Sequence, residues 1–303
     1  MQQIAILSHI VVDEVHQPGR PPHTEVGGAG AYAAVGTSLV AERAGRSLLV
    51  SGTGSADLAM LRAWCAARGI ADGLFVVGEH GPRTRIDYAA DGERVETPRF
   101  GLAHFDAHTP LPEHVPVPPA ELDGAYLFHD DEEPYWAAVA RYRARAAAVP
   151  LLWELSAACT RPERLASVRQ WAELVDAVSI NRTEAFELFG VDRIPAAVEA
   201  LRTLAPLVLL RLGGEGSLVI HGDTVVRVPA VPVTAVDPTG GGNSYTGAFL
   251  GAWAASGDPV GAARLASAAA AVVVATEGAP PVGDAERELV RRSAGALAAT
   301  RLE

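Results

Sequence analysis

The stretch Asp237-Pro-Thr-Gly-Gly-Gly-Asn243, followed by the apolar, Ala- and Gly-rich residues 244–255, is the most informative part of the chain. Three glycines let the backbone bend so that successive N–H groups point into one concavity. A helix start adds free N–H groups and partial positive charge. The pattern predicts a binding site for a phosphate or a transferring phosphoryl group. For the glycine triplet alone, a flexible loop before a core helix is the alternative.

Composition restricts the class of protein. The chain has 303 residues, 49% of them apolar, which suits one large α/β domain with a full core. Its net charge of −11 argues against a general nucleic-acid binder, although a local anion site can still take a nucleotide. Residues 1–13 are typical of a buried strand rather than a signal peptide, and the apolar residues 262–275 are too short for a membrane span. We therefore expect neither a nucleic acid nor a membrane as partner.

Cysteine usage fits a reducing compartment. Cys65 and Cys159 are too few for a disulfide framework and show no zinc spacing. A cytoplasmic location is therefore expected.

Apolar runs typical of strands alternate with helical patterns along the chain. Strands are expected at residues 4–12, 47–51, 74–77, 125–129, 150–154, 174–180, 207–211, 217–221 and 224–228. Helices are expected at residues 27–43, 57–68, 134–147, 164–171, within 182–204, and at 242–255, 259–276 and 284–298. This alternation predicts a mostly parallel sheet with helices on both faces. Ligands of such sheets bind beyond the carboxyl ends of the strands.

One hairpin interrupts the alternation. Residues 83–90 and 93–97 read as two strands joined by Asp91-Gly92, a pair that favours a tight turn. We interpret the chain as a single domain, residues 1–303, with this hairpin inserted at about 83–97 as a lid. The lid's strand edges need covering, and pairing with a second copy of the chain would form a homodimer.

Two features near the N-terminus fit a substrate. Asp13 follows the first expected strand, where a carboxylate can accept hydrogen bonds from sugar hydroxyls; a solvated turn is the alternative. Gly27-Gly28 opens a helix, and its glycines allow either close approach of a ligand or tight helix–sheet packing.

Two later features fit a nucleotide. Asn181-Arg-Thr-Glu184 follows a strand and predicts a capping box, in which Asn181 caps the helix and Glu184 reaches back. That role leaves open a second one, in which Glu184 organises the water shell of Mg²⁺. Gly213-Gly-Glu-Gly216 predicts either a plain hairpin turn or a backbone shelf beside a nucleotide.

The acidic run His129-Asp-Asp-Glu-Glu133 precedes an expected helix. Acids at a helix start are favoured by the helix dipole, and we prefer this interpretation to metal binding.

Taken in order, these elements resemble the ribokinase-like (PfkB) family of sugar and nucleoside kinases over nearly the whole chain. The resemblance implies a three-layer α/β sandwich with a mostly parallel central sheet and a small β-clasp lid. It also implies transfer of the ATP γ-phosphoryl group to a hydroxyl of a small substrate, with Mg²⁺ and in some cases K⁺.

The resemblance also assigns roles to residues. The catalytic set is Gly240, Gly241, Gly242 and Asn243. The substrate set is Asp13, Gly27, Gly28, Tyr32 and Asp237. The ATP set is Asn181, Glu184, Arg211, Gly213, Gly216 and Gly278, with Glu184 also serving the metal.

The chain departs from the family pattern at two positions. The family places Asp, its general base, where this chain has Asn243, and usually Asn where this chain has Tyr32. A subgroup best known from fungal Mak32-like proteins is similar to this chain in carrying Gly-Gly-Gly-Asn.

Three functions follow from Asn243. The first is a kinase without a base, since general-base help is worth about 10²–10⁴-fold and positioning carries much of phosphoryl transfer. The others are a catalytically silent nucleotide or sugar binder, and altered phosphoryl-transfer chemistry. If only the base is missing, Asn243→Asp raises turnover; if Asn243 serves as a hydrogen-bond donor to an anionic substrate, the same change lowers it.

Overall fold

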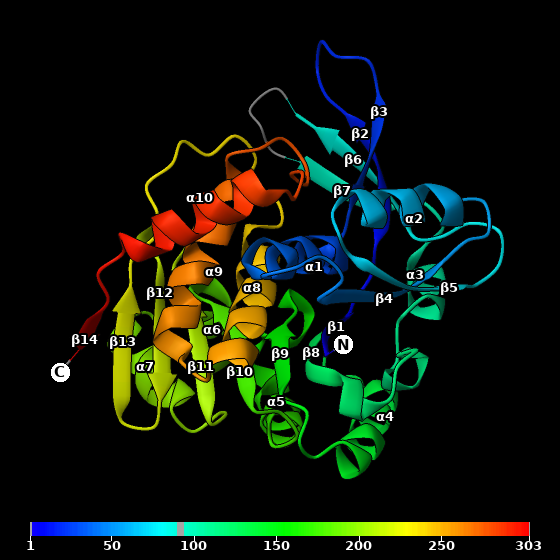
Figure 1. Ribbon diagram of the computed structural model, residues 1–303. Helices are drawn as coiled ribbons and strands as arrows, with labels where there is room; N and C mark the ends of the chain where they lie inside the picture. The colour runs from blue at the N-terminus through cyan, green and yellow to red at the C-terminus, as the bar shows by residue number, and fades with distance from the viewer. Residues whose placement is uncertain (1, 90–93, 303) are drawn as a thin grey trace.

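A computed structural model describes residues 2–89 and 94–302, and its larger unit is a central β-sheet (Figure 1). Its strands are β1 Gln3–Leu7, β4 Ser47–Thr53, β5 Ala71–Val76, β8 Leu122–His129, β9 Leu151–Leu155, β10 Ala177–Asn181, β11 Leu207–Arg211, β12 Ser217–His221, β13 Thr224–Val228 and β14 Thr300–Leu302. Within the described residues, their order is β14-β13-β12-β11-β10-β9-β8-β1-β4-β5. Neighbours from β11 to β5 pair in parallel, and β12, β13 and β14 continue the sheet antiparallel.

Helices cover both faces of this sheet, so the expected three-layer sandwich is confirmed. They are α1 Ala29–Val40, α2 Leu58–Ala67, α3 Leu102–Ala107, α4 Glu133–Arg145, α5 Leu165–Ala172, α6 Arg182–Phe189, α7 Ile194–Leu201, α8 Gly241–Ser256, α9 Pro259–Val274 and α10 Asp284–Gly295. One core joins the sheet to α1, α2, α8, α9 and α10, and the other joins it to α4–α7 (Figure 1). No helix in the described parts of the chain is long and apolar enough to cross a membrane.

A second, smaller sheet forms the lid above the central one (Figure 1). It has the order β3-β2-β6-β7, with β2 Val11–His16, β3 His23–Gly27, β6 Arg83–Tyr88 and β7 Arg94–Pro98. The hairpin expected at residues 83–97 is present as β6 and β7, which pair antiparallel. The tight turn expected at Asp91-Gly92 lies outside the described residues.

The expectation of one strand over residues 4–12 is wrong. The chain leaves the central sheet after Leu7 and enters the lid as β2 at Val11. Both segments are apolar and buried, and only the polar pair Ser8-His9 separates them in the sequence. Asp13 therefore lies on a lid strand and not at the end of a central strand. The lid strand β3 was not expected from the sequence either.

Helices α1 and α8 touch through their backbones. A Cβ added to Gly36 of α1 would clash with the Ser244 carbonyl oxygen, and one added to Gly247 of α8 would clash with the Ala33 carbonyl oxygen. Thr37 Oγ1 donates to the Gly247 carbonyl at 2.8 Å and locks the pair. Each helix begins close to one of the expected ligand sites, so this contact sets the distance between the two sites.

We predict that Gly247→Ala destabilises the protein by about 1–3 kcal/mol, the usual cost of overpacking a core. Because α8 must move, phosphate or nucleotide binding should weaken as well. Denaturant unfolding with and without ligand measures both effects. Gly295→Ala is the matched control, because a Cβ at Gly295 in α10 meets open space. Equal stability of the two variants would contradict the backbone contact.

Candidate active site

Helix α8 begins with three glycines, Gly240–Gly242, so no side chain precedes Asn243. Gly240 caps it in the left-handed conformation, with φ 72°, and the Tyr32 ring lies directly on its Cα. Gly242 lies against the Arg211 guanidinium in the same way. Since the first N–H groups of a helix lack helical partners and carry partial positive charge, this turn can bind an anion. The expected anion site thus gains a cation that the glycine motif does not contain.

A buried carboxylate links Asn243 to Arg211. Glu154 Oε1 accepts from Arg211 Nη1 at 2.5 Å and from Asn243 Nδ2 at 3.1 Å. Its Oε2 accepts from the Tyr126 hydroxyl at 2.8 Å, and Asn243 Nδ2 also lies 3.4 Å from that hydroxyl. These residues come from β9, β11, α8 and β8, so the network joins three central strands to the helix.

The surroundings of Arg211 and Tyr126 fix the protonation state of both side chains. Burial disfavours the charged form of Arg211, but the carboxylates of Glu154 and Glu184 outweigh it, so the pKa of Arg211 is raised. Burial, and then the charge of Glu154, raise the pKa of Tyr126 well above its usual value. Arg211 therefore stays cationic, and Tyr126 stays a hydrogen-bond donor.

The capping box expected at Asn181 and Glu184 is confirmed. Asn181 Oδ1 accepts from the Glu184 N–H, and Glu184 Oε2 accepts from the Asn181 N–H, each at 2.9 Å. The same Oε2 lies 3.8 Å from Arg211 Nη2. Burial raises the pKa of Glu184. The capping box thus holds a second carboxylate beside Arg211.

A cavity of about 390 Å³ opens at this point. The glycine turn at Gly213–Glu215 and Gly216 borders it, and its contact with a nucleotide stays a prediction. Apolar side chains line much of it, including Val231, Val233, Ala270 and Val274, and Gly241, Gly242 and Arg211 also line it. Its volume and lining suit a small organic ligand with an anionic end.

The substrate residues expected near the N-terminus come together. The Asp13 carboxylate lies on the Cα of Gly27, and Tyr32 packs between Gly27 and Gly240. Gly28 has φ 90°, and a Cβ there would lie 2.6 Å from the His9 carbonyl oxygen, so it packs tightly against the loop after β1. Tyr32 is 3% exposed, so it is a packing residue here, and its contact with a substrate stays a prediction.

Asp237 and Gly278 lie together at another place. Asp237 Oδ1 accepts from the Thr239 N–H at 2.9 Å, and its Oδ2 lies 3.4 Å from the Gly278 nitrogen. Burial, followed by the charge of Asp237, raises the pKa of Glu25 on β3. Gly278 is outside the cavity lining, so its nucleotide contact stays a prediction.

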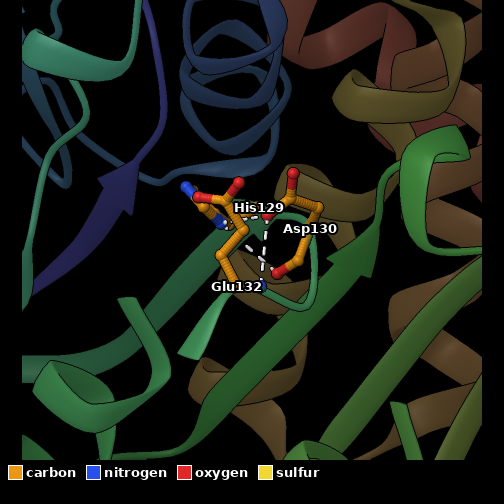
Figure 2. Close-up of side chains that lie close together, drawn as sticks. All are labelled: His129, Asp130 and Glu132. Carbon is orange, nitrogen blue, oxygen red and sulfur yellow. Dashed lines mark hydrogen bonds and ion pairs between the residues drawn. The ribbon is translucent and has the colours of Figure 1, made fainter. Parts of the chain in front are cut away.

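Figure 2 shows His129, Asp130 and Glu132 gathered beyond β8, with their ligand-type atoms within 4.8 Å of one another. His129 Nδ1 lies 2.9 Å from Asp130 Oδ1, and the His129 ring stacks on Tyr135. Hydrogen bonding to His129 lowers the pKa of Asp130. The helix α4 begins at Glu133, so the acids precede a helix as the dipole interpretation expects.

Solved structures define the class of fold. The structure superposes on adenosine kinase from Sinorhizobium meliloti with a TM-score of 0.78, 21% identity and coverage of 96% of this chain and 99% of that one. It superposes on ribokinase from Giardia lamblia with a TM-score of 0.76 and 20% identity, covering 97% of this chain and 98% of that one. It also superposes on an E. coli protein described as a ribokinase II and solved with ATP and Mg²⁺. The TM-score is 0.74, the identity is 17%, and the match covers 96% of this chain and 100% of that one. The fold is therefore ribokinase-like.

The signature of the pfkB family of carbohydrate kinases matches residues 4–282, and the chain belongs to this family. A nucleoside kinase from Methanothermobacter thermautotrophicus is 36% identical over 110 residues, which are 32% of this chain and 36% of that protein. A ribokinase from Lactococcus lactis is 34% identical over 77 residues, 25% of each chain. The chain thus spans about a third or less of these two relatives. Likeness to the Gly-Gly-Gly-Asn subgroup stays a prediction.

Sequence reasoning missed Glu154 and Tyr126. A glutamate inside the apolar run 150–154 was the only available signal. Its partners lie on β8, β11 and α8, so their identity depends on strand order and on the position of α8.

Proposed function

We propose that the protein is an ATP-dependent kinase that phosphorylates a hydroxyl of a small sugar, nucleoside or related metabolite. The observation that carries this proposal is the cavity, which has apolar walls and ends at the glycine turn of α8 and Arg211. A nucleotide base suits the walls, and its phosphates suit the glycine turn. The buried Arg211 Nε has no hydrogen-bond partner within the described residues, and a phosphate oxygen would supply one.

In this proposal the residues act by positioning and charge. Phosphoryl transfer has a loose transition state with charge spread over its oxygens, which N–H groups and a cation stabilise. Gly240 and Gly242 offer backbone N–H groups, whereas the Gly241 N–H already donates to the Pro238 carbonyl at 3.2 Å, and Arg211 offers the cation. Asn243 takes no proton, so the substrate hydroxyl would be oriented and not deprotonated by it.

The donor set fits Mg²⁺. Magnesium takes one or two carboxylates together with phosphate oxygens and waters, and Glu184 supplies a carboxylate beside Arg211. When bound, the ion would neutralise phosphate charge. K⁺ is proposed only as an activator, to be tested by its omission.

Asp13 is the proposed substrate anchor, accepting hydrogen bonds from hydroxyl groups. It is 8% exposed and lies across Tyr32 from Gly240, so it is apart from the cavity. The names of the relatives, nucleoside kinase and ribokinase, support the substrate class. The two free, buried cysteines support the proposed cytoplasmic location.

The direct test is a screen of sugars and nucleosides with Mg-ATP, scored by phosphorylated product. We expect product with at least one of them. Asp13→Ala should raise the KM for that substrate and leave the ATP affinity nearly unchanged, because the two ligands occupy different ends of the crevice. Equal loss of both affinities would point to a folding role for Asp13.

The silent binder is the competing function. It gains support if ATP binds but no phosphorylated product forms from any compound in the screen, with either the natural chain or Asn243→Asp.

We also propose that the lid pairs with a second copy of the chain. Within the described residues β3 and β7 are the open edges of the lid sheet, and open edges need cover. Sedimentation velocity should show a dimer. A monomer at high concentration would remove this part of the proposal and leave the lid itself intact.

A further inference from the structure

Position 243 has a partner that the glycine motif does not reveal. Asn243 Nδ2 and Arg211 Nη1 both donate to one oxygen of Glu154. Glu154 is 2% exposed, and a buried carboxylate persists only when it is paired and hydrogen-bonded. Tyr126 supplies the third donor. An amide at position 243 is therefore part of what holds the charge of Glu154.

Glu154 is not itself a replacement base. Its two oxygens already accept from three donors, one of them a guanidinium, so neither oxygen is left open to a substrate hydroxyl. Burial keeps it from solvent. It can hold its neighbours in place, but it is poorly suited to take a proton from a substrate.

A carboxylate at position 243 would meet Glu154 across about the same 3.1 Å that now separates a donor from an acceptor. Two carboxylates at such a distance cannot both ionise, and one pKa rises strongly. The charged and titratable neighbours are Tyr126, Arg211 and, beyond Arg211, Glu184. Arg211 would then face three carboxylates.

We propose that Glu154 is a positioning residue of the phosphoryl-transfer site, and that its buried carboxylate holds the Asn243 amide and the Arg211 guanidinium at the start of α8. This rests on the proposed kinase function. The amide at position 243 is then matched to Glu154, and Asn243→Asp alone lowers turnover. Restoring the family's carboxylate requires removing the charge of Glu154 at the same time.

The test is a double-mutant cycle of Asn243→Asp, Glu154→Gln and both together. The turnover number of each single variant should fall by at least about tenfold. Each should also lower Tm by about 2–4 °C or more. The double variant should regain most of both, because one carboxylate and one amide again face Arg211.

The pH dependence of Tm distinguishes repulsion between two carboxylates from the loss of a hydrogen bond. In Asn243→Asp the raised pKa of the carboxylate pair lets the folded state bind more protons than the unfolded state, so stability is lost as pH rises. The Tm deficit should therefore be larger at pH 8 than at pH 5.5, and the double variant should not show this growth. A lost hydrogen bond alone would give no such dependence.

Asp176→Asn provides the matched control. Asp176 pairs with Arg143 at 2.7 Å, just before β10 begins, whereas the site lies beyond the other end of that strand. Combined with Asn243→Asp, its effect on Tm should be additive.

Tm requires no turnover, so it tests the inference even if the kinase proposal fails for lack of product. If Asn243→Asp alone does not fold, recovery of folded protein in the double variant supports the same conclusion. Higher turnover or an unchanged Tm in Asn243→Asp would overturn the inference. So would a double variant no better than the sum of the singles.

Discussion

Backbone contact between α1 and α8 is the constraint on which the site depends. Gly36 and Gly247 allow each helix to reach the carbonyl oxygens of the other, and no larger residue fits. The start of α1 follows Gly27 and Gly28 beside Asp13, and the start of α8 forms the anion turn. Because the helices cannot slide apart without losing this contact, the proposed substrate residues and the proposed phosphate site keep a fixed separation. Positioning of this kind contributes strongly to rate when two reactants must meet.

Charge at the start of α8 depends on Arg211 and its carboxylate partners. Its side chain is 11% exposed and pairs with Glu154. A lone guanidinium would be costly to bury, and a lone Glu154 would be costlier still. Pairing the two groups lowers the cost of burying each of them. It also places the Arg211 cation against Gly242, beside the proposed phosphate site. Asn243 takes part in these electrostatics, because its amide donates to the carboxylate that pairs with Arg211.

Much of this arrangement was predictable, because its signals are local. The glycine turn, the capping box at Asn181 and Glu184, and the hairpin at residues 83–97 each depend on residues close in sequence. The break between β1 and β2 was not predictable, since both segments are buried and apolar periodicity continues through them. The partners of Glu154 were not predictable either. They come from β8, β11 and α8, and only the strand order and the start of α8 bring them together.

We propose that the first turn of α8 holds the phosphate that is transferred. A crystal structure with Mg²⁺ and a non-hydrolysable ATP analogue tests it most directly. We expect the base in the cavity beside Val231 and Val274, with the terminal phosphate within hydrogen-bond distance of the N–H groups of Gly240 and Gly242 and close to Arg211. A nucleotide bound elsewhere, or one whose terminal phosphate avoids this turn, would contradict it.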